Sequence, residues 1–265
     1  MDTPQPDWNA SVYHRVSAPQ TAWGTEVLER LTLSGTETVL DAGCGTGKLT
    51  RLLAERLPRG RVVALDGSKD MLGVATRELA SFGSRVEFVQ ATLPEVPLRA
   101  PVDAIFSTAT LHWVLDHPAV FRAFLNVTRP GGHLEFQCGG VGNLHRLHER
   151  AEALARTKEF VDAFQNFEEP WCYAGAEETA EQLEEAGWTS VHTWLEVRPT
   201  PFSDAAAFSE FISSVNLRPF LSKLDERRGR RFAAALVEAA GKDNPPYVLD
   251  YVRLNASARA PEASG

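Results

Sequence analysis

Residues 39–47 of this chain read Val39-Leu40-Asp41-Ala42-Gly43-Cys44-Gly45-Thr46-Gly47. A short apolar run enters a glycine-rich turn, and leucines at helical spacing follow from residue 49 onward. Glycines at a strand-to-helix turn let a ligand approach the backbone closely, and the first turn of the helix presents free N–H groups. The stretch therefore predicts a ligand-binding turn in an α/β fold.

A dinucleotide-binding site would also place a glycine-rich turn between a strand and a helix, but two details of this turn differ from that pattern. A G-x-G-x-x-G motif that starts at Gly43 requires a glycine at position 48, where this chain has Lys48. Asp41 also places a carboxylate beside the turn, which is a poor neighbour for a pyrophosphate and a good one for a cation. The residues favour a ligand that carries positive charge.

An acidic residue follows the turn at the spacing expected for a ribose contact. Residues 61–66 are predicted to form the second strand, which ends in Asp66, 19 positions after Gly47. In a doubly wound sheet, an acidic residue about 20 positions beyond the glycine turn accepts hydrogen bonds from ribose hydroxyls. The alternative role for Asp66 is to cap the following helix, but Ser68 suits that position better. We expect Asp66 to bind a ribose.

Three further segments extend this pattern: VEFVQATLPEVPL at 86–98, PVDAIFSTATLHWV at 101–114 and NVTRPGGHLEFQ at 126–137. From about residue 35 to 140 the chain resembles the class I S-adenosylmethionine-dependent methyltransferases, whose cofactor carries a sulfonium and an ammonium group. The resemblance implies S-adenosyl-L-methionine as the cofactor. It also implies a doubly wound, mostly parallel, Rossmann-like α/β sheet with helical lid additions.

Shorter motifs resemble the small-molecule branch of this superfamily that contains trans-aconitate methyltransferase. They are Trp8 followed by Tyr13, Leu111-His112-Trp113 followed by Asp116-His117, and Leu217-Arg218-Pro219-Phe220-Leu221 followed by Leu224-Asp225-Glu226. Similarity to this branch implies O-methylation of a small carboxylic acid.

The composition narrows the partners of the chain. Its 265 residues are 43% hydrophobic and carry a formal net charge of −8, which opposes binding to nucleic-acid backbones. The basic cluster at 227–231 is interleaved with acids and is typical of a solvated helix face, with partner binding as the alternative. The three cysteines have no metal-ligand spacing, no apolar run is long enough to span a membrane, and the first residues do not resemble a signal peptide. We expect a cytoplasmic protein without nucleic-acid or membrane partners.

Apolar periodicity alternates between strand and helix over residues 39–140, which is typical of a parallel sheet covered by helices. Strands are predicted at 38–42, 61–66, 86–90, 102–107 and 133–138. Beyond them we expect helices over 143–165 and 177–186, a strand over 191–197, a helix capped by Ser203, another after Pro219, and a last strand over 247–256. By resemblance, the last strand runs antiparallel.

These elements suggest three parts of the chain. Residues 1–34 are expected to form an N-terminal helical segment over the cofactor site, and 35–256 the methyltransferase domain with helical lid insertions near 143–187 and 203–241. Residues 257–265 are small and polar, and we expect them to be disordered.

The resemblance assigns cofactor contacts residue by residue. Asp41, Gly43, Gly45 and Gly47 surround the methionine moiety, and Thr108 lies close to it. Asp66 and Gly67 meet the ribose, and Met71, Thr92 and Leu93 meet the adenine. Tyr13 and Gln20 belong to the segment that folds over the cofactor, as do Trp8 and Trp23. Aromatic packing of a leading helix is the alternative for this group and is favoured for Trp23, and core packing is the alternative for Met71. This chain has Thr92 where the family usually has Asp, so the exocyclic amine meets a hydroxyl rather than a carboxylate.

The catalytic chemistry makes few demands on side chains. The end of the fourth strand lacks the D/N-P-P-Y/F signature of enzymes that methylate nucleic-acid bases. His112 is a candidate general base, and a structural histidine is the alternative. A carboxylate acceptor is already ionised at neutral pH and needs no base. No cluster of Asp, Glu and His suggests a metal site.

The acceptor site is expected to include Trp113, Trp171 and Tyr173 in its wall and Arg218 as the cation for an acceptor carboxylate. Arg146 is an alternative cation, and solvent exposure is the default for either arginine. Two other functions stay open at this point. One is O-, N- or C-methylation of a secondary metabolite or lipid precursor that is not a carboxylate. The other is a regulatory protein that binds S-adenosylmethionine without catalysis.

Overall fold

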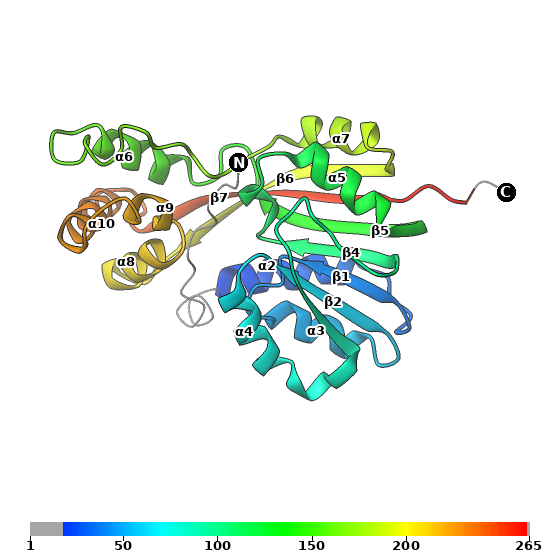
Figure 1. Cartoon of the computed structure of the whole chain (residues 1–265). Coiled ribbons are helices and arrows are strands. Elements are labelled where there is room, and N and C mark those ends of the chain that lie inside the picture. Colours follow the sequence, from blue (N-terminus) through cyan, green and yellow to red (C-terminus); the bar gives the residue numbers. More distant parts are fainter. Residues whose placement is uncertain (1–17, 264–265) are drawn as a thin grey trace.

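The protein was analysed as a computed structural model that describes residues 18–263 (Figure 1). Seven strands form one sheet in the order β3-β2-β1-β4-β5-β7-β6. They are β1 (Thr38–Ala42), β2 (Arg61–Asp66), β3 (Val86–Gln90), β4 (Val102–Thr108), β5 (Thr128–Gly139), β6 (Thr189–Pro201) and β7 (Val248–Arg259). The predicted doubly wound α/β sheet is confirmed.

Strands β1 to β5 are parallel, whereas β7 enters the sheet antiparallel between β5 and β6. The strand order reverses between β1 and β4, so the connections leave these two strands toward opposite sides. In such sheets the crevice at the carboxyl ends of the strands, at the reversal point, receives the ligand. The glycine turn after β1 lies at this point.

The helices are α2 (Ala18–Arg30), α3 (Lys48–Arg56), α4 (Lys69–Glu78), α5 (His117–Asn126), α6 (His145–Ala155), α7 (Ala176–Glu185), α8 (Ala205–Ser214), α9 (Arg218–Leu221) and α10 (Glu226–Gly241), with short 3₁₀ segments at Ala80–Arg85 and Leu111–Trp113. Helices α2, α3 and α4 cover one face of the sheet and α5 and α7 the other (Figure 1). The described residues of this part thus form three layers.

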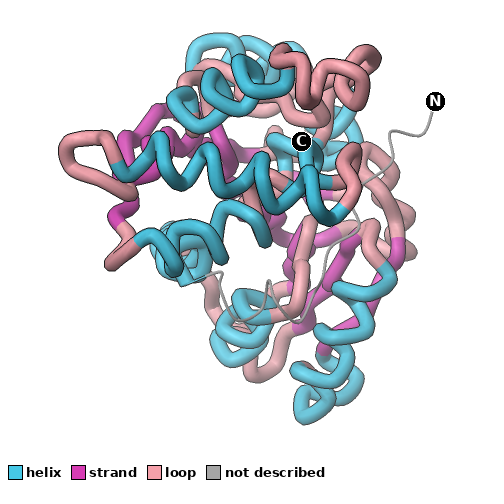
Figure 2. Tube along the Cα trace, turned by 90° about the vertical axis from the view of Figure 1, so that its left-hand side faces the viewer, coloured by secondary structure: helices cyan, strands magenta, loops and turns pink. Residues whose placement is uncertain are grey.

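Helices α6, α8, α9 and α10 lie beyond the end of the sheet and form what we call the helical cap (Figure 1). Viewed from that side, helices and loops of the cap stand in front of the strands (Figure 2). Its core is aromatic, with edge-to-face and stacked contacts among Phe160, Phe164, Phe220 and Phe232. Helix α7 was expected to belong to the lid, but it packs on α5 and β6 instead.

Capping residues explain where several helices begin. Ser68 caps α4 by accepting a hydrogen bond from the N–H of Met71, as expected from the sequence. Asp116 caps α5, which also has Pro118 in its first turn. The cap of α8 is Asp204, which accepts from two backbone N–H groups, so the assignment to Ser203 was wrong by one residue.

Two other predicted elements have different lengths in the structure. The helix expected over 143–165 ends at Ala155. The following segment instead forms tight turns with backbone hydrogen bonds between residues three apart, and its phenylalanines, Phe160 and Phe164, pack in the core of the cap. Strand β5 starts at Thr128 rather than at the predicted residue 133. Short apolar periodicity cannot separate a helix from a series of tight turns.

The expected disorder of 257–265 is wrong for its described part. Strand β7 continues to Arg259, where Ser257 and Arg259 pair with both neighbouring strands. The backbone then continues beside β5, since the N–H of Ala260 donates to Gly132 and the carbonyl of Pro261 accepts from Gly131. Small residues fit here because Ala258 and Ala260 are buried against the sheet. Across residues 18–263, no helix combines the length and hydrophobicity needed to cross a membrane.

Candidate functional site

A cavity of about 1140 Å³, its open mouth included, lies at the carboxyl ends of the strands, where the strand order reverses. Its wall is shared by the turn after β1, the ends of β2 and β4, strand β7, and the segments that join the sheet to the cap. The ends of several strands and helices that are far apart in the sequence therefore meet around one chamber.

The glycine turn is held in place by the neighbouring strand. The N–H of Gly43 donates to the carbonyl of Leu65 over 2.7 Å, and the N–H of Gly45 donates to the carboxylate of Asp66 over 2.9 Å. Gly45 has φ +54°, and a Cβ built there would meet no atom within 4 Å, because that side of the turn opens into the cavity. A ligand can therefore approach the backbone at Gly45 closely.

Gly43 and Gly47 are needed for other reasons. A Cβ on Gly43 would lie 2.0 Å from the hydroxyl of Thr110, so the glycine allows β4 to approach the turn. Gly47 has φ +84°, packs against Ala75 and Leu79 of α4, and is not among the residues that line the cavity. The expected ligand contact of Gly47 is thus replaced by a packing role at the start of α3.

Asp66 points its carboxylate at the turn and at the start of α4. Besides the bond from Gly45, one oxygen accepts from the N–H of Ser68 over 2.8 Å. Burial raises the pKa of Asp66 above its usual value, while the two backbone N–H bonds lower it. Gly67 lines the cavity beside it. The structure therefore places Asp66 where the sequence predicts the ribose site.

Asp41 lies deeper, behind the turn. It is 2% exposed and accepts a 2.6 Å hydrogen bond from the hydroxyl of Thr50. Burial raises the pKa of Asp41 to about 7, the bond from Thr50 opposes this, and the charge of Asp66 adds to it. Asp41 lines a smaller cavity next to the main one, together with Gln20, Thr108 and other residues of the turn. A cation in that space would favour the ionised carboxylate.

The far side of the cavity is apolar. Met71, Ala91 and Leu93 are buried and line it, in agreement with the predicted adenine contacts of Met71 and Leu93. Thr92 is exposed and is not among the lining residues, so the expected contact of its hydroxyl with an adenine has no support. Position 92, where this chain has Thr and the family usually has Asp, thus lies on the surface.

Helix α2 contributes to the opposite wall. Gln20 lines both cavities, is 9% exposed, and its side-chain carbonyl has no hydrogen-bond partner among the described residues. Trp23 packs edge-on against Tyr251 with ring centres 5.0 Å apart, which confirms the packing alternative. Trp8 and Tyr13 lie outside the described residues, and their predicted contacts stay predictions.

His112 lines the cavity, but its hydrogen bonding does not suit a general base. Its Nδ1 accepts from the N–H of Gly139 over 3.3 Å, so a neutral ring carries its proton on Nε2. Burial, with the charge of Arg253, keeps the pKa of His112 well below its usual value. A neutral ring in this tautomer donates a hydrogen bond from Nε2 and has no free basic nitrogen. The predicted general base is therefore corrected to a hydrogen-bond donor.

Aromatic rings form the wall between the sheet and the cap. Trp171 stacks on His148 with ring centres 4.4 Å apart, and Tyr173 lies nearly parallel to both rings. Trp113 meets Trp171 edge-on at 6.4 Å. All four residues line the cavity, as predicted for Trp113, Trp171 and Tyr173. His148 was not predicted from the sequence, because the one signal for it is its position on α6, one helical turn after the buried Leu144.

A guanidinium that sequence reasoning did not identify also lines the cavity. Arg253 of β7 is 3% exposed, and its guanidinium carbon lies 5.0 Å from the ring centre of Trp23 and 5.9 Å from that of Tyr251. Its position opposite Gly139 places it at the carboxyl end of β5. The available signal was an arginine in the middle of a predicted strand, between Val252 and Leu254, since charged residues are rarely buried without a function or a partner.

A polar network runs along the same face of β5 and β7. The amide of Gln137 donates to Asn255 over 2.9 Å, and Asn255 also accepts from Arg30 over 3.1 Å. Arg30 pairs in turn with Glu135 at 3.0 Å. Gln137 faces the Nε of Arg253 at 3.5 Å, so this buried network supports the orientation of the guanidinium.

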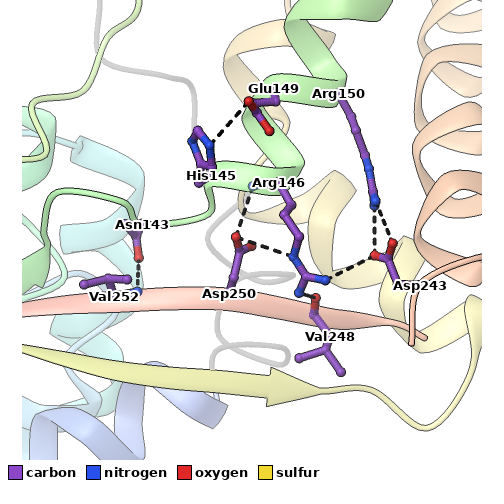
Figure 3. A network of polar contacts seen from close by, with 9 residues as sticks. All are labelled: Asn143, His145, Arg146, Glu149, Arg150, Asp243, Val248, Asp250 and Val252. Carbon is purple, nitrogen blue, oxygen red and sulfur yellow. Dashed lines mark hydrogen bonds and ion pairs between the residues drawn. The ribbon is translucent and has the colours of Figure 1, made fainter. Parts of the chain in front are cut away.

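The two arginines chosen from the sequence lie elsewhere. Arg218 starts α9 and is not among the residues that line the cavity. Arg146 bonds the carbonyl of Val248 over 3.0 Å and pairs with Asp243 and Asp250, as Figure 3 shows. It therefore joins α6 to β7 and the end of α10. Arg146 is thus engaged outside the chamber, whereas the contact predicted between Arg218 and an acceptor stays a prediction.

No group of three or more His, Cys, Asp or Glu side chains that could hold a metal occurs within residues 18–263. The donors and apolar surfaces of the cavity do fit S-adenosylmethionine. An acid stands at the end of β2, an open glycine backbone follows β1, and a buried thioether and aliphatic groups line the opposite side.

Comparison with known proteins agrees with this site. Residues 39–132 match a family described as a methyltransferase domain. The trans-aconitate 2-methyltransferase of Azoarcus sp. (strain BH72) is 31% identical over 252 residues, which are 91% of this chain and 92% of that protein. The enzyme of the same name from Paracidovorax citrulli (strain AAC00-1) is 33% identical over 244 residues, 86% of this chain and 87% of the relative.

Solved structures agree at the level of the fold. Phosphoethanolamine N-methyltransferase 2 of Haemonchus contortus, in complex with S-adenosyl-L-methionine, has a TM-score of 0.61 at 17% identity; the match covers 96% of this chain and 56% of that longer one. The [4+2]-cyclase SpnF has a TM-score of 0.57 at 19% identity, over 92% of this chain and 82% of its own. The sequence relatives, the sheet and the site together show that this chain belongs to the class I S-adenosylmethionine-dependent methyltransferases and is an enzyme with S-adenosylmethionine as its cofactor.

Proposed function

We propose that this enzyme transfers a methyl group to a carboxylate oxygen of a small acid. The observation that carries the proposal is the buried guanidinium of Arg253 in the wall of the chamber that also holds the glycine turn and Asp66. An arginine presents two parallel N–H groups to a carboxylate, and it stays charged when buried. The relatives named trans-aconitate 2-methyltransferase support an acid as the acceptor.

The cofactor end of the chamber is assigned to the residues at the strand ends. Asp66 accepts the ribose hydroxyls, the backbone at Gly43 and Gly45 lies along the methionine moiety, and Met71 and Leu93 enclose the adenine. The carboxylate of Asp41 and the side-chain carbonyl of Gln20 face the region for the ammonium group. When bound, S-adenosylmethionine supplies a methyl group activated by the adjacent sulfonium.

The acceptor end needs to orient the nucleophile and exclude water. Arg253 holds the acceptor carboxylate, and His112 donates from Nε2 to one of its oxygens or to a neighbouring polar atom. No base is required, because the carboxylate is already ionised, which agrees with the loss of His112 as a candidate base. Proximity and alignment account for the rate in such a displacement. Trp113, Trp171 and Tyr173 shield the chamber from solvent.

Replacing Arg253 tests the proposal. For the best acid from a defined panel, Arg253→Met should raise KM by roughly 10- to 100-fold, because hydrogen bonds to charged groups contribute about 1.5–3 kcal/mol. Arg253→Lys should restore part of the loss, since it keeps the charge without the paired geometry. Binding of S-adenosylhomocysteine, measured by calorimetry, should change little and would show that the variants are folded.

Arg218→Met is the matched control and should leave KM unchanged. The methyl ester itself can be identified because alkaline hydrolysis releases methanol from it, which methyl ethers and methylated amines or carbons do not do. A product of that second kind would replace this proposal with O-, N- or C-methylation of another metabolite. Because the chain belongs to a family of enzymes, the alternative of a regulatory protein that binds S-adenosylmethionine without catalysis is not pursued.

A further inference from the structure

We propose that the acceptor is an acid with a single carboxylate on a flat, apolar body, rather than a polycarboxylate such as trans-aconitate. This inference rests on the proposed carboxylate methylation and names its substrate class. It comes from two independent features of the chamber: the number of charges in its wall and the arrangement of its aromatic rings.

Positive charge is scarce in the described part of the wall. Among the lining residues within 18–263, Arg253 is the single lysine or arginine, and the acidic Asp66 stands at the cofactor end. The two lining histidines add no charge near neutral pH, because burial lowers the pKa of His148 to about 4 and that of His112 well below its usual value. The part of the wall that these described residues form can thus compensate one carboxylate with a full charge.

Each additional carboxylate would face neutral groups. The remaining polar side chains near Arg253 are neutral amides and hydroxyls, with Asn143 and Tyr251 nearly fully buried and Asn216 donating to the Tyr251 hydroxyl over 3.1 Å. Neutral donors hold an ionised group less strongly than charged ones, and a buried carboxylate without a cation is strongly unfavourable. Trans-aconitate carries three carboxylates, so two of them would lack a cationic partner in the part of the wall that residues 18–263 form.

The ring arrangement indicates the shape of the acceptor body. His148, Trp171 and Tyr173 have ring planes within 18–26° of one another, and Trp113 stands nearly perpendicular to Trp171. Leu144, Val114 and Val215 complete this side of the wall. These rings stack on one another, and together with the aliphatic groups they give the chamber a flat apolar wall. Such a wall favours a planar apolar group, because stacking adds to burial of its surface.

The test uses a pair of acids that are matched in shape and differ in charge. The full-length enzyme with S-adenosylmethionine is given 4-nitrocinnamate and 4-carboxycinnamate, which have the same body and nearly the same shape but differ by one negative charge. Benzoate, cinnamate, 2-naphthoate and trans-aconitate complete the panel. The readouts are kcat/KM from the formation of S-adenosylhomocysteine and identification of the methyl ester by mass spectrometry.

We expect at least one aromatic monocarboxylate to exceed trans-aconitate by tenfold or more in kcat/KM, and 4-nitrocinnamate to exceed 4-carboxycinnamate by a similar factor. Equal or better use of the dianion, or a preference for trans-aconitate over every monocarboxylate, would overturn the inference and leave the proposed function intact. If the enzyme esterifies none of these acids, including trans-aconitate, the carboxylate acceptor fails and the inference fails with it.

Discussion

Burial sets the charge of each functional side chain in this enzyme. Asp41 and His112 are both nearly inaccessible, and in both cases the neutral form is favoured relative to a group in water. For His112 this leaves a hydrogen-bond donor. For Asp41 it leaves a carboxyl that titrates near neutral pH, next to the region where we place a cation. His112 therefore stays neutral over the physiological pH range, whereas the charge of Asp41 changes within that range.

Asp41 should make cofactor binding depend on pH. Its pKa of about 7 in the free enzyme means that the carboxyl is mostly protonated at pH 6, while a nearby ammonium group binds the ionised form better. Affinity should therefore rise with pH from 6 to 8, by at most about tenfold per unit below the pKa, and then level off. Calorimetry with S-adenosylhomocysteine at pH 6, 7 and 8 measures this rise.

Asp41→Asn supplies the control for that experiment, because the amide keeps the size of the side chain and cannot ionise. Its affinity should be flat over the same range and weaker than that of the wild type at pH 8. An identical slope in the variant would assign the pH dependence to another group, with Asp66 as the next candidate.

At the scale of elements, one turn combines a glycine that faces the chamber with a glycine that packs against a helix. Gly45 faces the chamber, whereas Gly47 faces helix α4. Both glycines have positive φ, so replacing either of them strains the backbone. The two substitutions differ in what the added side chain meets, which is open space at Gly45 and helix α4 at Gly47.

The matched substitutions Gly45→Val and Gly47→Val separate these roles. Gly45→Val should abolish cofactor binding while the protein stays folded, because the side chain enters the ligand space. Gly47→Val should lower the free energy of unfolding more than Gly45→Val does, since it also crowds Ala75 and Leu79. Thermal unfolding and calorimetry check the pair; normal affinity in Gly45→Val would show that this turn does not meet the cofactor.

At the scale of the whole molecule, strand β7 connects the parts. It lies between β5 and β6, contributes Arg253 and Tyr251 to the chamber, and is tied to the cap through Arg146 and Asp250 (Figure 3). The hydroxyl of Ser257 also donates to Glu135 over 2.6 Å. The acceptor site and the stability of the sheet therefore depend on the same strand.

Truncation tests this dependence. A chain that ends at Ala256 loses the last pairs of β7 with β5 and β6, and its free energy of unfolding should fall by about 2–5 kcal/mol, from several hydrogen bonds of about 1 kcal/mol each and two buried alanines. A chain that ends at Pro261 keeps these contacts and should unfold like the full-length protein in urea. Equal stability of the two truncated chains would return residues 257–261 to the disordered tail expected from composition.

Much of the cofactor half could be predicted because its signals are local. The turn at 39–47, the acid at Asp66 and the alternation of strands and helices depend on residues close together in sequence, whose preferences agree with the final fold. The sheet and the place of Asp66 at the chamber agree with these local signals, whereas the antiparallel last strand and the places of Met71 and Gln20 agree with what the family resemblance implied. Thr92 and Gly47 do not, because their surroundings depend on how loops and α4 pack.

The acceptor half was decided by contacts between distant parts of the chain. The sequence suggested Arg218, with Arg146 as the alternative, because periodicity cannot tell which guanidinium faces a chamber. Insertion of β7 beside β5 brings Arg253 to Gly139, and the segment after α6 brings Trp171 and Tyr173 to the same wall. Such pairings gain their free energy only when the sheet is assembled, so no local pattern of residues records them.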